Sequence, residues 1–144
     1  MPEQIEMDAS EGLLDLVFVM ADHGMKSMNA LGLGESFTPF AIVDDGRGRK
    51  LIRFSAEFLE DGLNKAREYV LHNRSDIAVY GIAHDGYVTI RGEKSDAVLI
   101  EAGETGCADA YIFTQRYKPN TGSGINDPTG NLAFMGKVAS RLVP

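Results

Sequence analysis

Cysteine, positive charge and long hydrophobic runs are all scarce in this chain of 144 residues. A single cysteine, Cys107, cannot form an intrachain disulfide, so we expect the protein to reside in a reducing compartment, the cytoplasm. The longest apolar run, Leu16–Ala21, is far shorter than the roughly 20 residues that a membrane-spanning helix needs. The first residues are acidic and lack the basic segment of a secretory signal peptide, so we do not expect secretion.

The excess of acidic side chains, which gives a net charge of −7, argues against two classes of partner. Affinity for nucleic acids depends largely on Lys and Arg at phosphates, and an anionic membrane would repel the chain for the same reason. Aromatic residues on the predicted strands do not change this, because proteins that bind single strands combine such residues with basic charge. We expect no nucleic-acid and no membrane partner.

The chain lacks the residue patterns of common catalytic and metal sites. His23, His72 and His84 fall on different predicted elements, without the paired spacing of metal ligands on one helix. His84 is the best candidate of the three, because the adjacent Asp85 could orient its ring. Cys107 has no neighbouring base, and the acidic residue near it disfavours a thiolate. We therefore predict no catalytic residue, no metal and no cofactor.

Two segments have the three-to-four-residue apolar spacing of amphipathic helices, and a loose polar tail, residues 1–10, precedes them. The first helix spans residues 11–31, with Ser10 as its N-cap. The second spans residues 56–71, with Ser55 as its N-cap. The first helix has a wide apolar stripe, so it either packs deeply or contributes to an interface. The stripe includes three methionines, which suit adaptable contacts: Met20, Met25 and Met28.

Runs of β-forming residues after each helix predict an antiparallel sheet. Residues 37–43 and 50–54 form a hairpin, and residues 76–118 form a meander of three or four further strands. Residues 119–131 are rich in Gly, Asn and Pro, which predicts an irregular loop. The apolar residues 132–143 then end the chain as a short helix or an edge strand.

The sequence near Asp85-Gly86 is compatible with two different strand pairings. Asp-Gly is typical of a tight two-residue hairpin turn, which would end a strand there. In the second interpretation, residues 77–90 form one long strand with a bulge at Gly86, and the turn lies at residues 92–95. The strongly β-type continuation Tyr87–Ile90 favours the long strand.

The element order is therefore α-β-β-α-β-β-β, followed by a final helix or strand. We predict a single α+β domain over residues 1–144, with two main helices and an antiparallel sheet of five to six strands. The helices are expected to cover one face of this sheet. The predicted core consists of Leu13, Val17, Met20, Phe40, Ile42, Leu59, Leu63, Val79, Val98, Ile100 and Ile112.

Two resemblances follow from this order and from short motifs. The order resembles roadblock/longin-type domains, in which helices flank an antiparallel sheet and the fold supports dimers. The motifs Phe37–Ala41 after a helix, Lys94–Val98 opening a strand and Tyr117–Pro119 closing the next are similar to a group of small bacterial proteins of unknown function. That likeness spans residues 11–119 and implies a bacterial cytoplasmic protein, with no catalytic residues to carry over.

Two functions of different classes are compatible with these features. The first is a non-enzymatic protein-interaction module, either a homodimer or a subunit that binds another protein, as the wide apolar stripe indicates. The alternative is a small-molecule binding protein or enzyme. Its pocket would lie between the sheet and residues 120–130, with Asp96, Arg116 and Tyr117 as polar anchors.

Overall fold

A computed structural model describes residues 9–31 and 35–143, and it confirms the predicted α+β class. Helices α1 (Glu11–Leu31) and α2 (Leu59–His72) pack on a six-stranded antiparallel sheet of order β2-β1-β3-β4-β5-β6. Its strands are β1 (Phe40–Asp44), β2 (Arg49–Arg53), β3 (Val79–Ile90), β4 (Glu93–Glu104), β5 (Asp109–Asn120) and β6 (Ile125–Ala139). Among the described residues, no helix has the length and apolar character needed to cross a membrane.

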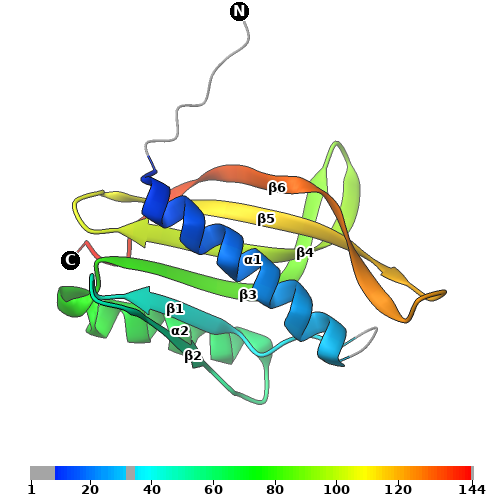
Figure 1. Cartoon of the computed structure of the whole chain (residues 1–144), viewed down its shortest axis with the longest axis horizontal. Coiled ribbons are helices and arrows are strands. Elements are labelled where there is room, and N and C mark those ends of the chain that lie inside the picture. The colour runs from blue at the N-terminus through cyan, green and yellow to red at the C-terminus, as the bar shows by residue number, and fades with distance from the viewer. Residues whose placement is uncertain (1–8, 32–34, 144) are drawn as a thin grey trace, which may run out of the picture.

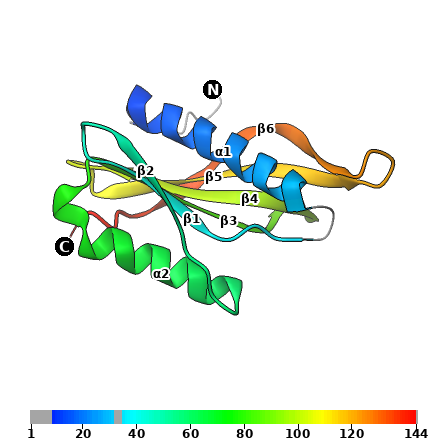
Figure 2. The same cartoon turned by 60° about the horizontal axis from the view of Figure 1, so that its bottom comes forward.

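The two helices lie on opposite faces of the sheet, as Figures 1 and 2 show. Along β1, Phe40 and Ile42 pack in the same cluster as α1, whereas Ala41 and Val43 pack in the cluster that contains α2. The prediction that both helices cover one face is therefore wrong. Four successive buried residues in β1 require apolar cover on both sides, because neighbouring side chains of a strand point to opposite faces.

Helix α1 has the predicted bounds and the predicted cap, since Ser10 Oγ accepts a hydrogen bond from Leu13 N at 3.1 Å. Residues 1–8 of the predicted tail lie outside the described residues. Most of the apolar stripe of α1 faces the sheet, whereas its apolar residues Phe18 and Leu31 are 61% and 52% exposed. Its three methionines are buried against the sheet, each at most 7% exposed: Met20, Met25 and Met28.

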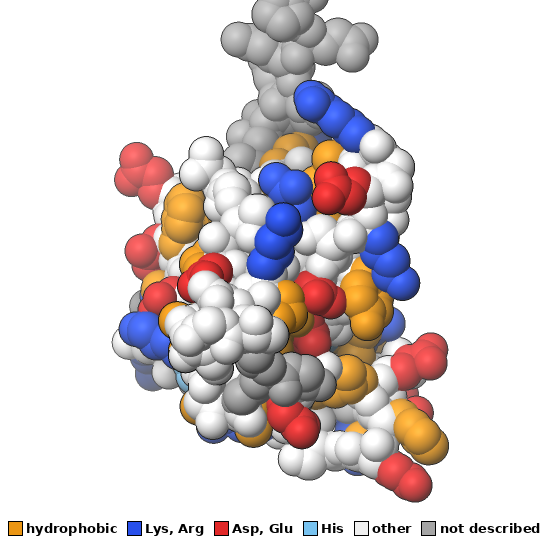
Figure 3. Space-filling model, turned by 90° about the vertical axis from the view of Figure 1, so that its right-hand side faces the viewer, with side chains coloured by type: hydrophobic (Ala, Val, Ile, Leu, Met, Phe, Trp, Pro, Cys, Tyr) orange, Lys and Arg blue, Asp and Glu red, His pale blue; other side chains and the backbone are white. Residues whose placement is uncertain are grey.

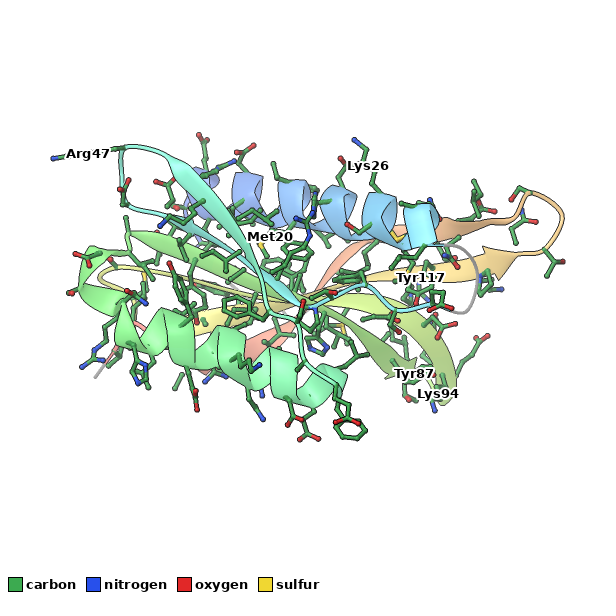
Figure 4. The ribbon with its side chains drawn as sticks, turned by 90° about the horizontal axis from the view of Figure 1, so that it is seen from below. Met20, Lys26, Arg47, Tyr87, Lys94 and Tyr117 are labelled. Atoms are coloured by element: carbon green, nitrogen blue, oxygen red, sulfur yellow. The ribbon has the colours of Figure 1, made fainter. Side chains whose placement is uncertain are left out.

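Two glycines allow α1 to approach the sheet closely. A Cβ on Gly24 of the helix would lie 3.0 Å from Val98 Cγ1, and a Cβ on Gly81 of β3 would overlap Met20 Sδ. Met20 is fully buried between α1 and the sheet (Figure 4). The contact therefore leaves no room for an added methyl group at Gly81.

Helix α2 begins later than predicted, at Leu59, so Ser55 is not its N-cap. The backbone N–H of Phe54 donates to Pro39 O at 2.9 Å, which extends the β1–β2 hairpin and delays the helix. Leu59, a predicted core residue, is consequently 42% exposed at the helix start. The other predicted core residues are at least half-buried, and seven are fully buried: Leu13, Val17, Met20, Phe40, Ile42, Val98 and Ile100.

Strand β3 is long, as the favoured interpretation predicts, but it has no bulge. Its pairing with β4 runs in continuous register through Asp85-Gly86, which excludes both the tight turn and the bulge at that point. The hairpin turn is Arg91-Gly92, not residues 92–95. Both turn residues have positive φ, 53° at Arg91 and 78° at Gly92. This backbone geometry matches the twist of the flanking strands.

Residues 119–131 belong to a hairpin and not to an irregular loop. Strand β5 continues to Asn120, whose side-chain Oδ1 accepts a hydrogen bond from Gly122 N at 3.0 Å and so organises the turn. The Gly, Asn and Pro residues of this stretch are tolerated because β6 is an edge strand with register shifts. Of the two alternatives predicted for residues 132–143, a short helix or an edge strand, the structure has the edge strand, as the second half of β6 up to Ala139.

We predict that Gly81→Ala lowers the free energy of unfolding by about 1–3 kcal/mol, because the new methyl group must displace the buried Met20. Urea unfolding followed by circular dichroism measures the change. Gly48→Ala is the control: a Cβ there meets no atom within 4 Å, so it should change stability by less than about 0.5 kcal/mol. Equal effects of the two substitutions would contradict close packing at Gly81.

Candidate functional site

A cavity of about 270 Å³ lies beside the segment that follows α1, where the β3–β4 and β5–β6 hairpins diverge (Figure 4). We call it the end cavity. Viewed from this side, acidic and hydrophobic side chains lie together, with Lys and Arg side chains close to them (Figure 3). The residues that line the end cavity come from five segments: Glu35, Ser36, Asp85, Tyr87, Asp96, Tyr117, Pro119 and Asn126.

Two hydroxyl groups hold the carboxylate of Asp85. Tyr117 Oη donates to Asp85 Oδ1 at 2.6 Å, and Ser36 Oγ donates to Asp85 Oδ2 at 2.6 Å. Ser36 is positioned by the next residue, Phe37, which is buried in the cluster under α1. Burial, the hydrogen bond to Asp85 and the charge of Asp96 raise the pKa of Tyr117. The phenol therefore stays protonated and remains a donor.

The negative charge of the end cavity is not balanced by ion pairs. No described Lys or Arg lies within ion-pair distance of the carboxylates of Glu35, Asp85 or Asp96. Lys94 is two residues from Asp96 on β4, but its ammonium lies over the Tyr87 ring, 4.2 Å from the centroid (Figure 4). The cavity therefore presents carboxylates that form no ion pair with a described side chain, with the Lys94 ammonium as a cation at its rim.

Asn126, at the start of β6, contributes a buried amide that lacks a partner. The residue is 2% exposed, and its backbone N–H donates to Asn29 Oδ1 of α1 at 2.7 Å. Its side-chain Nδ2 has no hydrogen-bond partner among the described residues. Leaving such a group unpaired costs about 1–3 kcal/mol. An acceptor atom of a bound molecule would remove this cost.

The structure brings two of the three predicted anchors together. Asp96 and Tyr117 are direct partners across β4 and β5, and both line the end cavity. Arg116 precedes Tyr117 on β5 and so points to the opposite face of the sheet, where its guanidinium lies close to Gly130. The predicted pocket beside residues 120–130 thus corresponds in part to the end cavity, through Asn126.

Sequence reasoning assigned only Asp96 and Tyr117 to this cavity and missed its other six lining residues, among them the three that make its polar contacts: Ser36, Asp85 and Asn126. Asp85 precedes a glycine in a pair typical of turns, and Asn126 falls in the segment predicted to be an irregular loop. Ser36 gives no signal at all. The contacts that assemble them join residues far apart in the chain: Ser36 and Asp85 are 49 positions apart, and Asn29 and Asn126 are 97 apart. A single sequence carries no local signal for such pairs.

A second hollow, of about 190 Å³, lies beside α2 on the opposite face. We call it the α2-side groove. Burial and the nearby Arg67 lower the pKa of His84, whose Nδ1 lies 3.1 Å from the backbone carbonyl of Asp85. Asp85 thus contacts the ring through its backbone and not its carboxylate. The groove is lined by Leu63, Arg67, Ile82, His84, Leu99, Ile100, Glu101 and Ile112.

The three histidines remain apart, as their positions in the sequence predict. His23 packs against Phe40, with ring centroids 4.8 Å apart, and His72 is exposed at the end of α2. Within the described part of the chain, no three His, Cys, Asp or Glu side chains are grouped as a metal site requires. The end cavity and the α2-side groove are two hollows of the described surface that bring titratable side chains together from several elements.

Comparisons with protein-family models, with curated proteins and with solved structures find no match for this chain. The resemblances to roadblock/longin-type domains and to small bacterial proteins thus stay predictions. What can be inferred about function depends on the geometry of the two sites.

We predict that stability falls as the pH drops below about 6.5, the pKa of an unperturbed histidine. The pKa of His84 is lowered in the folded state, so in this range the unfolded chain binds a proton that the folded chain does not. His84→Gln should reduce this slope, and the remaining slope includes the contribution of His23, whose pKa is lowered by burial and by Arg53. The control, His72→Gln at an exposed position, should leave the slope unchanged. Urea unfolding at pH 5 to 8 measures both, and equal slopes for wild type and His84→Gln would refute the assignment.

Proposed function

We propose that this protein binds a small polar molecule in the end cavity. The observation that carries the proposal is the Asn126 side chain, buried at the cavity wall with its Nδ2 unpaired. Folded proteins leave few buried polar groups unsatisfied, and an oxygen of a ligand would complete this one. Concave sites with a few convergent polar groups are also the usual form of ligand pockets.

The size and chemistry of the cavity support binding in preference to catalysis. At about 30 Å³ per water-sized group, its volume of about 270 Å³ suits a ligand of roughly nine non-hydrogen atoms. Both oxygens of Asp85 already accept hydrogen bonds from hydroxyl groups. This carboxylate therefore lines the cavity but is not free to act as a general base. The proposed location is the bacterial cytoplasm, which the single cysteine and the short motifs support.

We predict that Asn126→Leu leaves the free energy of unfolding unchanged or raises it by about 1 kcal/mol, because it removes an unpaired buried donor. Asn120→Leu is the matched control in the same hairpin. The Asn120 amide bonds to Gly122 N and Asp127, so its loss should cost about 1–2 kcal/mol. Urea unfolding compares the two variants. Equal destabilisation would show that Asn126 has a structural role.

The same variant tests binding directly. Wild-type protein is titrated with a library of small amines, polyols and carboxylates, and amide chemical shifts are followed by NMR. The proposal expects at least one compound to shift the amides of Asp96, Tyr117 and Asn126, and expects Asn126→Leu to weaken that compound's binding. If every compound leaves these amides unchanged, the proposal fails.

A protein-interaction function, with the chain as a homodimer, is the second candidate. The methionine stripe that indicates it in the sequence is buried within the chain, so it offers no surface to a partner. The α2-side groove favours this candidate instead. It leaves Leu63, Leu99 and Ile112 only half-buried beside α2, next to each other on one concave apolar surface.

If this surface forms a homodimer, light scattering after size exclusion should give twice the chain mass of 15.6 kDa. Leu99→Arg should then reduce the mass to that of the monomer, because a buried, unpaired charge opposes association. Phe18→Arg, on the outer face of α1 where Phe18 is 61% exposed, is the control and should keep the dimer. A monomeric wild type at high concentration would rule out this candidate.

A further inference from the structure

We infer that the molecule bound in the end cavity is a small organic cation that also carries a hydroxyl or carbonyl oxygen. The inference rests on the proposed function, because it names the class of ligand for the same cavity. Two independent observations carry it: the uncompensated carboxylates at the wall, and the unpaired amide of Asn126.

The first observation specifies the charge of the ligand. Glu35 follows α1, Asp85 lies on β3 and Asp96 lies on β4, so three separate segments bring acidic groups to one cavity. None of the three forms an ion pair with a described side chain. An anion would be repelled here, and a neutral molecule would leave the carboxylates uncompensated.

An aromatic ring at the rim of the cavity also favours a positively charged ligand. The ammonium of Lys94 lies 4.2 Å from the centroid of the Tyr87 ring (Figure 4). Aromatic faces attract cations in this way, and sites that recognise organic ammonium groups combine such rings with acidic side chains. Tyr87 lines the cavity and is 63% exposed, and Lys94 occupies one face of its ring.

The second observation specifies the rest of the ligand. A carboxylate only accepts hydrogen bonds, whereas the Nδ2 group of Asn126 only donates them. A bare metal ion would leave this donor unpaired, and the described carboxylates of the cavity are not grouped as a metal site requires. A molecule with an ammonium group at one end and an oxygen at the other satisfies both, with the ammonium at Asp96 and the oxygen at Asn126.

Three probes of similar size test the inference: ethanolamine, ethylene glycol and glycolate. Each carries a hydroxyl group, and their charges are positive, neutral and negative. Titrations followed by NMR should show ethanolamine shifting the Asp96 and Asn126 amides with a millimolar Kd, as expected for so small a ligand. Ethylene glycol should bind at least tenfold more weakly, and glycolate should cause no shift.

Variants then identify the charge responsible. Asp96→Asn should weaken ethanolamine binding about tenfold, because it removes the carboxylate without changing its shape. Glu93→Gln is the matched control: it changes the net charge equally, but Glu93 is on β4 at a position that faces away from the cavity. Its effect on the Kd should stay below twofold. Equal effects of the two variants would attribute the binding to overall charge, and would overturn the site.

The possible results separate this inference from the proposed function. If ethylene glycol or glycolate shifts the cavity amides as strongly as ethanolamine, the cavity binds ligands but the cationic class is wrong. The cationic class is also wrong if ethanolamine causes no shift while a neutral or anionic library compound does. If neither the three probes nor any library compound shifts these amides, the proposed function itself fails.

Discussion

The close contact between α1 and the sheet is the constraint on which the rest of the structure depends. It is made through Gly24 on the helix and Gly81 on β3, where a side chain would meet Val98 and Met20. A helix rises 1.5 Å per residue, so fixing Gly24 also fixes the end of α1 only two turns later. There Asn29 bonds to the backbone of Asn126, and the following segment brings Ser36 to Asp85. The end cavity is thus a consequence of where the helix lies.

The carboxylates of the end cavity differ from Glu101, a half-buried acid on β4, in how their charge is compensated. The carboxylate of Glu101 accepts hydrogen bonds from Tyr80 at 2.7 Å and from Arg141 at 2.9 Å, so this half-buried acid is fully compensated. In the end cavity, Asp85 is held by hydroxyl groups alone, and the amide of Asn126 is left unpaired. The fold can therefore satisfy buried polar groups. Among the described residues two buried side-chain atoms lack a partner, Thr114 Oγ1 and Asn126 Nδ2, and only Asn126 lines the end cavity. An unpaired donor at a cavity wall is typical of sites shaped by a ligand and not by stability.

The parts of the fold that could be predicted are those with local signals. The spacing of apolar residues predicts the extent of α1, and Ser10 predicts where it begins. The runs of β-forming residues predict the strands. The start of α2 could not be predicted, because it depends on the hydrogen bond between Phe54 and Pro39, which joins two strands. Residues 119–131 have the composition of a loop, and only their place at the edge of the sheet allows them to pair. That helices cover both faces of the sheet follows from β1. Its four successive apolar residues point alternately to the two faces, so both faces need apolar cover.

In the candidate site, too, some residues could be predicted from local sequence signals, and others depend on contacts between distant parts of the chain. Asp96 and Tyr117 lie on adjacent strands of a meander, so their meeting follows from local pairing, and strand periodicity would have placed Arg116 on the other face. Asp85 and Asn126 carry residue types common to turns and to binding sites, and only the end of α1 brings them to one cavity. The methionine stripe makes the converse point. Its width is compatible with deep packing or with an interface, and the sheet of the same chain covers its methionines. The width of an apolar stripe reports how much surface must be covered, and not which chain covers it.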